Sequence, residues 1–185
     1  MSTCSAPATE DDLAPQPRRP RELSIYYLQM TGAAQLRLPA RPAAGLTLRA
    51  VDPPDGAINR QMYEDVGQHW NWLDRLTWPA SRWQAYAEQP ALATWLGCVH
   101  DEAVGYFELE VQPHHNVQIA YFGLRPEHVG RGLGGALLAA ALEQAWSIEG
   151  TRRVWLHTCS HDHPHALRNY QARGLTIYRT VHRRM

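Results

Sequence analysis

The residues best suited to chemistry form a glycine-rich run between two apolar segments. Residues 117–124 are mostly apolar, and residues 133–146 carry apolar side chains spaced three or four apart. Gly130, Gly132 and two further glycines lie at the junction. A strand that turns through glycines into a helix leaves backbone N–H groups free at the helix N-terminus, and phosphate oxygens can approach them closely. The pattern predicts an anion-binding turn, and a tight turn without a ligand is the alternative.

A dinucleotide is the first anion to consider, because Gly130, Gly132 and Gly135 match the pattern G-x-G-x-x-G. That pattern opens the first β-α-β unit of its fold and precedes an acidic residue about 20 positions further on. Here the turn lies late in the chain, and the next predicted strand ends at 157–159 without an acidic residue. The dinucleotide interpretation therefore fails. A P-loop also fails, since the chain contains no lysine.

A mixed sheet with helices must position this turn. The predicted strands span 24–29, 46–51, 92–99, 103–111, 117–124, 154–158 and 175–181, and the predicted helices span 58–89, 132–146 and 163–173. We expect the first helical region to break near 77–80, with Ser81 as the N-cap of its second part. This order predicts one α/β domain over 23–185, preceded by a disordered tail over 1–22.

Composition excludes several classes of partner. The 18 basic and 18 acidic residues give no net charge, so no overall field attracts nucleic acid or anionic lipid. No apolar run approaches the roughly 18 residues that span a bilayer. The N-terminus lacks the apolar core of a secretory signal, and three cysteines do not form a disulfide framework. We therefore expect a cytoplasmic protein without nucleic-acid or membrane partners.

The glycine turn and a second motif together resemble a known family. Pro126-Glu127, the segment Gly130-Arg131-Gly132-Leu133-Gly134 and the later segment Asn169-Tyr170-Gln171-Ala172-Arg173-Gly174-Leu175 are similar to the GCN5-related N-acetyltransferase (GNAT) superfamily. The resemblance covers residues 46–181 in element order. It implies an acyl-CoA acyltransferase fold with a mostly antiparallel central sheet flanked by helices. In that fold the fourth and fifth strands, here 117–124 and 154–158, splay apart.

The resemblance implies acetyl-CoA as co-substrate, with its pyrophosphate in the glycine turn. The family's turn is usually Gln/Arg-x-x-Gly-x-Gly/Ala, and Val129 stands where its first residue would be. Backbone amides do most of the anion binding, so we expect the site to survive this departure, with Arg131 adding charge. The implied coenzyme-binding residues are Phe122, Gly123, Leu124, Val129, Gly130, Arg131, Gly132, Leu133, Gly134, Gly135, Asn169 and Tyr170.

The implied reaction is direct attack of a primary amine on the thioester in a ternary complex. By resemblance, the backbone amide of Phe122 stabilises the oxyanion, and Tyr170 protonates the leaving thiolate. Many relatives carry a glutamate base where this chain has Gln118, so the base must lie elsewhere. Glu108 and Glu110 on the neighbouring predicted strand, and His157 and Asp162 at the end of the opposite one, are the groups to consider. We favour Glu108, with His157 as the second candidate. A tyrosine or acid that serves only packing is the alternative at each position.

Other interpretations stay open. The cluster over 157–165 holds four histidines and a cysteine, but its spacing matches no zinc template, so we expect it to edge the acceptor pocket. An aromatic region over 63–78 with nearby acids suits a small cationic amine, while a peptide N-terminus or an aminoglycoside also remains open. A non-catalytic acyl-CoA sensor of the same fold is the alternative function. The sequence does not fix an oligomeric state, and a homodimer is compatible with it.

Overall fold

The computed structural model describes residues 22–40, 43, 45–70 and 72–184, so the predicted tail lies outside the described residues except for Glu22. Within these ranges seven strands form one sheet: β1 Glu22–Met30, β2 Leu46–Ala50, β3 Leu92–Val99, β4 Glu102–Gln112, β5 Asn116–Leu124, β6 Arg153–Cys159 and β7 Thr176–Arg184. The helices are α1 Gly56–Gly67, α2 Ala80–Ala87, α3 Leu133–Ser147 and α4 Ala166–Ala172. Short 3₁₀ turns lie at Ala33–Gln35, Pro113–His115 and Pro126–His128.

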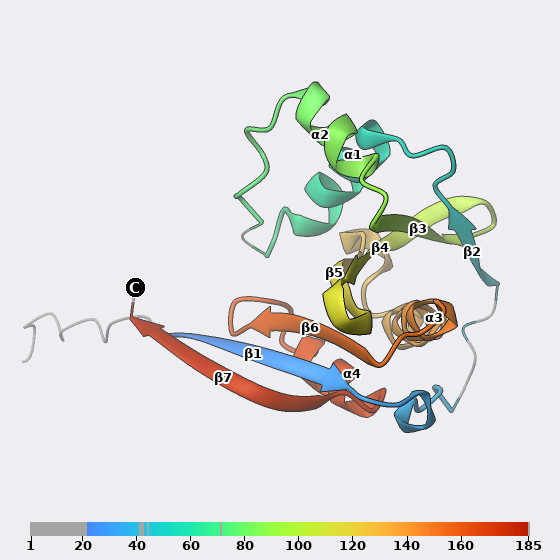
Figure 1. Ribbon diagram of the computed structural model, residues 1–185. Coiled ribbons are helices and arrows are strands. Elements are labelled where there is room, and N and C mark those ends of the chain that lie inside the picture. The colour runs from blue at the N-terminus through green and yellow to red at the C-terminus, as the bar shows by residue number, and fades with distance from the viewer. Residues whose placement is uncertain (1–21, 41–42, 44, 71, 185) are drawn as a thin grey trace, which may run out of the picture.

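The strand order is β2-β3-β4-β5-β6-β1-β7. All neighbours are antiparallel except β5 and β6, which run parallel. The expected mixed α/β architecture with a mostly antiparallel sheet is therefore confirmed. Figure 1 shows β1 lying between β7 and β6, at the opposite side of the sheet from the strand that follows it in the chain.

The expected splay lies between β5 and β6. Their pairing is confined to Asn116–Gln118 against Arg153–Trp155, although β5 runs on to Leu124 and β6 to Cys159. The register between β4 and β5 shifts beside this point, because Glu108 faces Tyr121 while Leu109 faces Ile119. A bulged strand bends and twists more strongly. This local bend accompanies the separation of β5 from β6.

Helices cover the two faces of the sheet in different ways. On one face α3 buries Leu137, Leu138 and Leu142 against β4, β5 and β6 in the main core. On the other face α1 packs Met62 and Val66 against β3 and β4. Figure 1 shows α1 and α2 gathered at one end of the molecule, over the β3–β5 part of the sheet. No helix in the described ranges is both long and apolar enough to cross a membrane.

The structure corrects the predicted helical region over 58–89. The break is much wider than expected, since α1 ends at Gly67 and α2 begins at Ala80. The N-cap is Pro79 and not Ser81, because the Pro79 carbonyl accepts from the amides of Arg82 at 3.0 Å and Trp83 at 3.2 Å. Between the two helices the path of the chain is set by the packing of its tryptophan rings against Tyr63 of α1 and Trp83 of α2, and not by helical periodicity. We call residues 68–70 and 72–79 the acceptor loop, because the sequence leads us to expect the acceptor beside their aromatic side chains.

Candidate functional site

A groove of about 1320 Å³ opens where β5 separates from β6. The second half of β5, the end of β6 and the starts of α3 and α4 line it, together with the acceptor loop and β1. It takes in most of the predicted site residues: Phe122, Gly123, Leu124, Val129, Gly130, Gly132, Gly134, Gly135, His157, Asn169 and Tyr170. Arg131, Leu133 and Glu108 do not line it.

The glycine turn forms one end of the groove. Gly130 and Gly132 have φ values of 82° and 78°, in the left-handed region that side chains other than glycine rarely adopt. Gly132 is the N-cap of α3, so the turn leads directly into the helix and its free N–H groups. Asn169 donates from Nδ2 to the Gly134 carbonyl at 3.3 Å and thereby fixes α4 to this first turn. This end can bind an anion.

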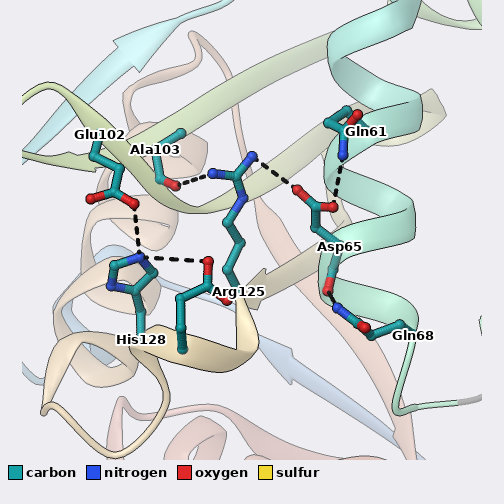
Figure 2. A network of polar contacts seen from close by, with 8 residues as sticks. Gln61, Asp65, Gln68, Glu102, Ala103, Arg125 and His128 are labelled. Atoms are coloured by element: carbon teal, nitrogen blue, oxygen red, sulfur yellow. Dashed lines mark hydrogen bonds and ion pairs between the residues drawn. The ribbon is translucent and has the colours of Figure 1, made fainter.

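A polar network holds the chain that enters the glycine turn (Figure 2). Arg125, just after β5, pairs its Nη2 with Asp65 of α1 at 2.9 Å and donates from Nη1 to the Ala103 carbonyl at 3.0 Å. His128 is buried, with its Nε2 at 3.6 Å from Glu102 Oε1. These contacts tie the turn to α1 and to the start of β4, so the anion-binding end is preorganised.

Tyr170 and Phe122 meet in the middle of the groove, with ring centroids 6.0 Å apart. Tyr170 is only 8% exposed, and burial together with the negative charge of Asp162 holds its pKa well above the ordinary value for tyrosine. The phenol therefore stays protonated near neutral pH. A protonated hydroxyl at this place can donate a proton or a hydrogen bond.

Glu108, the favoured candidate base, lies outside the groove in a closed polar cluster. Asn59 donates from Nδ2 to its Oε1 at 2.7 Å, and the hydroxyl of Tyr86 donates to its Oε2. Burial raises the pKa of Glu108, with Tyr86, Asn59 and the nearby Arg75 acting in the opposite direction. The structure therefore does not bring this carboxylate to the predicted reaction centre.

His157, the second candidate base, does line the groove. Its ring lies beside those of Tyr27 at 5.8 Å and Trp155 at 6.5 Å. His157 is exposed to the groove, and partial desolvation there lowers its pKa, while the nearby charge of Asp162 works in the raising direction. The imidazole is therefore neutral near pH 7 and able to accept a proton.

The sequence places Asp162 beside His157 at the end of this strand, but it did not reveal that Asp162 closes the turn by hydrogen bonds. One carboxylate oxygen of Asp162 accepts from Thr158 Oγ1 at 2.5 Å and from the Cys159 amide at 2.9 Å. This closes the turn that carries the histidine cluster into the groove lining. An acid three or four residues beyond a strand-ending threonine is the signal that could have revealed it.

The acceptor loop supplies the far end of the groove with Trp70, Trp72, Leu73 and Asp74. Leu23 and Ile25 of β1 also line the groove, which the sequence did not reveal because it did not place β1 beside β6. Among the described residues no group of three or more His, Cys, Asp or Glu side chains could hold a metal ion.

Comparison with known families decides the identity of the fold. The family model described as "Acetyltransferase (GNAT) family" matches residues 59–175, more than half of the chain. The chain belongs to the GNAT family. A search of curated proteins found no match. The family resemblance drawn from the two motifs is thus confirmed.

Solved structures agree with the GNAT assignment. A GCN5-related N-acetyltransferase from Sphaerobacter thermophilus is similar with TM-score 0.67 and 20% identity over 90% of this chain and 52% of that one. A GCN5-related N-acetyltransferase from Kribbella flavida is similar with TM-score 0.61 and 21% identity, over 86% of this chain and 56% of that one. The present chain thus spans about half the length of these two. An aminoglycoside acetyltransferase from an uncultured soil metagenomic sample, solved in complex with sisomicin, is similar with TM-score 0.59 and 14% identity. The match covers 69% of this chain and 86% of that one. At these identities the likeness shows the fold.

Proposed function

We propose that this GNAT protein is an acetyl-CoA-dependent N-acetyltransferase that acetylates a primary amine by direct attack in a ternary complex. One observation carries the proposal. A single groove joins the glycine turn to an aromatic and acidic end through the splay of β5 and β6. Such a groove gives two substrates access to the same point from opposite ends.

The residues present fit the coenzyme. The glycine turn and the N-terminus of α3 offer backbone donors for a pyrophosphate, and β5 offers an unpaired edge along the groove. Acetyl-CoA brings an activated thioester, whose acetyl group passes to the amine as the thiolate leaves. We assign coenzyme binding to the groove-lining residues of β5, of the turn and of α4.

Three groups of this chain then take separate roles in the reaction. The backbone amide of Phe122 stabilises the oxyanion, and Tyr170 gives its proton to the departing thiolate. We assign removal of the ammonium proton to His157, because it lines the groove and its lowered pKa favours the neutral imidazole. Glu108 is left without contact to the groove.

A thermal unfolding scan with acetyl-CoA, with coenzyme A and with NADH as control tests the binding half of this proposal. A ligand at about 100 times its Kd stabilises by roughly 2.7 kcal/mol. For a chain of this size the Tm should rise by roughly 5–11 °C. A rise with the coenzyme A species alone supports the assignment, and no rise with any of them would remove it.

Thiol release from acetyl-CoA in the presence of primary amines tests the catalytic half. We expect turnover that depends on both substrates. Coenzyme binding without turnover of any amine would instead favour the non-catalytic acyl-CoA sensor, whose best support is Val129 in the glycine turn and Gln118 in place of a glutamate.

A further inference from the structure

We infer that the acceptor is an amine with a single ammonium group on an aromatic or other apolar body. This inference rests on the proposed function and names the substrate class of the same site. It comes from the walls of the groove beyond Tyr170, where the acceptor must lie if the coenzyme occupies the glycine end.

The wall on the side of α1 is made of aromatic rings that hold one another in place. The ring of Trp72 lies 5.4 Å from that of Tyr63 and 4.9 Å from that of Tyr121, and Tyr63 and Tyr121 meet edge to face at 5.3 Å. Tyr63 is 1% exposed and lies behind the other two. Trp72 and Tyr121 line the groove, so they present a rigid aromatic surface to it.

The groove is also bridged at its mouth. Trp70 of the acceptor loop meets His163 of the turn after β6 edge to face at 5.2 Å. Leu23 and Ile25 of β1 line the side of β6, with Leu73 on the loop side. A body that fits between these walls meets apolar side chains of the loop and of β1 and imidazole rings of the turn after β6, and it can exclude water from the apolar ones.

Asp74 is the carboxylate on the aromatic side of this space. Its Oδ1 accepts from the hydroxyl of Tyr63 at 2.7 Å, and its other oxygen has no hydrogen-bond partner among the described residues. A carboxylate beside aromatic rings attracts an ammonium group by charge, and the rings add cation–π attraction.

The neighbouring arginine does not neutralise Asp74. The guanidinium of Arg75 turns the other way and lies over the rings of Trp78, Tyr86 and Tyr121 at 4.1–4.6 Å. It also interacts electrostatically with the buried Glu108. The loop thus separates its two charges, with the cation withdrawn into the protein and the carboxylate at the groove.

The acid on the opposite wall is already engaged. Asp162 accepts two hydrogen bonds from its own turn and lies near His157 and Tyr170. Asp74 and Asp162 are the only acids among the described residues that line the groove, so a molecule with several ammonium groups would leave most of them without a charged partner, which is costly. This favours a monoamine with an apolar body over a polycationic sugar.

The test compares acceptors on the full chain by thiol release at saturating acetyl-CoA. The probes are 2-phenylethylamine, n-butylamine, glycine ethyl ester and sisomicin. We expect kcat/KM for 2-phenylethylamine to exceed that for glycine ethyl ester by about tenfold or more, as expected for burying several additional apolar carbons. Sisomicin should be the poorest of the four.

Two substitutions and one matched control locate the effect. Asp74→Asn should raise KM for 2-phenylethylamine by about tenfold or more, the size expected for a hydrogen bond to a charged group, and leave the Kd of acetyl-CoA unchanged. Asp101→Asn removes an exposed carboxylate from the β3–β4 turn and is the matched control, with no change in KM. Trp72→Leu should reduce the preference for 2-phenylethylamine over n-butylamine.

The outcomes separate the two proposals. Amine turnover with sisomicin as the best acceptor, or an Asp74→Asn enzyme with an unchanged KM, would overturn the acceptor class and leave the N-acetyltransferase intact. If the unaltered protein binds acetyl-CoA but acetylates none of the four amines, the proposed function fails, and the acceptor class fails with it.

Discussion

Replacing Gly132 by alanine tests whether the shape of the glycine turn creates the coenzyme site. Gly132 adopts φ +78° immediately before α3, and a Cβ added there would meet nothing within 4 Å. The substitution therefore causes no steric clash with the rest of the protein. It only penalises the left-handed backbone that directs the following N–H groups into the groove.

The size of the effect follows from that backbone penalty. A left-handed conformation costs a residue with a Cβ about 1–2 kcal/mol relative to glycine. Because Gly132 is exposed and nothing packs on it, the turn can relax in the free protein and must be restored when the ligand binds. The same free energy then appears as a rise of about 5- to 30-fold in the Kd of acetyl-CoA.

Titration calorimetry of both coenzyme A species measures this Kd, and Gly45→Ala is the matched control. Gly45 has φ +76°, and an added Cβ there would approach only Val99 at 3.9 Å. It precedes β2, outside the groove lining. The control therefore carries the same backbone penalty and should leave the Kd unchanged. An unchanged Kd in Gly132→Ala, or an equal rise in both variants, would refute the assignment of the turn.

Three further substitutions test the chemistry. Tyr170→Phe keeps the ring contact with Phe122 and removes the hydroxyl, so kcat should fall by about 100-fold or more while the Kd of acetyl-CoA stays the same. Partial desolvation lowers the pKa of His157, so kcat should rise with pH through a midpoint below 6.5, and His157→Gln should abolish that rise in a pH–rate profile. Glu108→Gln leaves one acceptor oxygen for Asn59 or Tyr86 and sets an NH2 donor against the other, so calorimetric unfolding should show a loss of about 1–3 kcal/mol with the rising limb of the pH profile retained.

Each of these expectations has an outcome that contradicts it. A parallel loss of kcat and coenzyme affinity in Tyr170→Phe would make the hydroxyl structural. A rising limb that survives in His157→Gln would move the base to another group. A limb that disappears in Glu108→Gln would give the buried carboxylate a role in proton transfer that its enclosed position does not suggest.

Local patterns predicted most of the fold because each element has a strong local signal. The apolar runs over 92–99 and 117–124 and the helical stripe over 133–146 correspond to β3, β5 and α3 within one residue at each end. The acceptor loop has no such signal. Its tryptophans mimic the apolar positions of a helix, but their rings pack on Tyr63 and Trp83, and the chain leaves the helix at Gly67 to allow this.

The position of β1 depends on long-range pairing that no local pattern records. Residues 24–29 have the composition of a strand, which the structure confirms as part of β1. Its neighbours β6 and β7 lie more than a hundred residues away in the chain. Leu23 and Ile25 therefore enter the groove only through a topology that period-two alternation cannot specify.

The two candidate bases show why the sequence alone does not predict which residues line the groove. On an alternating strand Glu108 shares a face with Tyr106 and Glu110, and the sequence cannot say what covers that face. In the structure α1 and α2 cover it at Glu108, supply Asn59 and Tyr86 as donors, and leave the carboxylate 1% exposed. The same face continues onto β6, which α1 and α2 do not reach, and there His157 stays open to the groove. The reach of two helices across one sheet thus encloses one titratable residue in hydrogen bonds and leaves the other open to the groove.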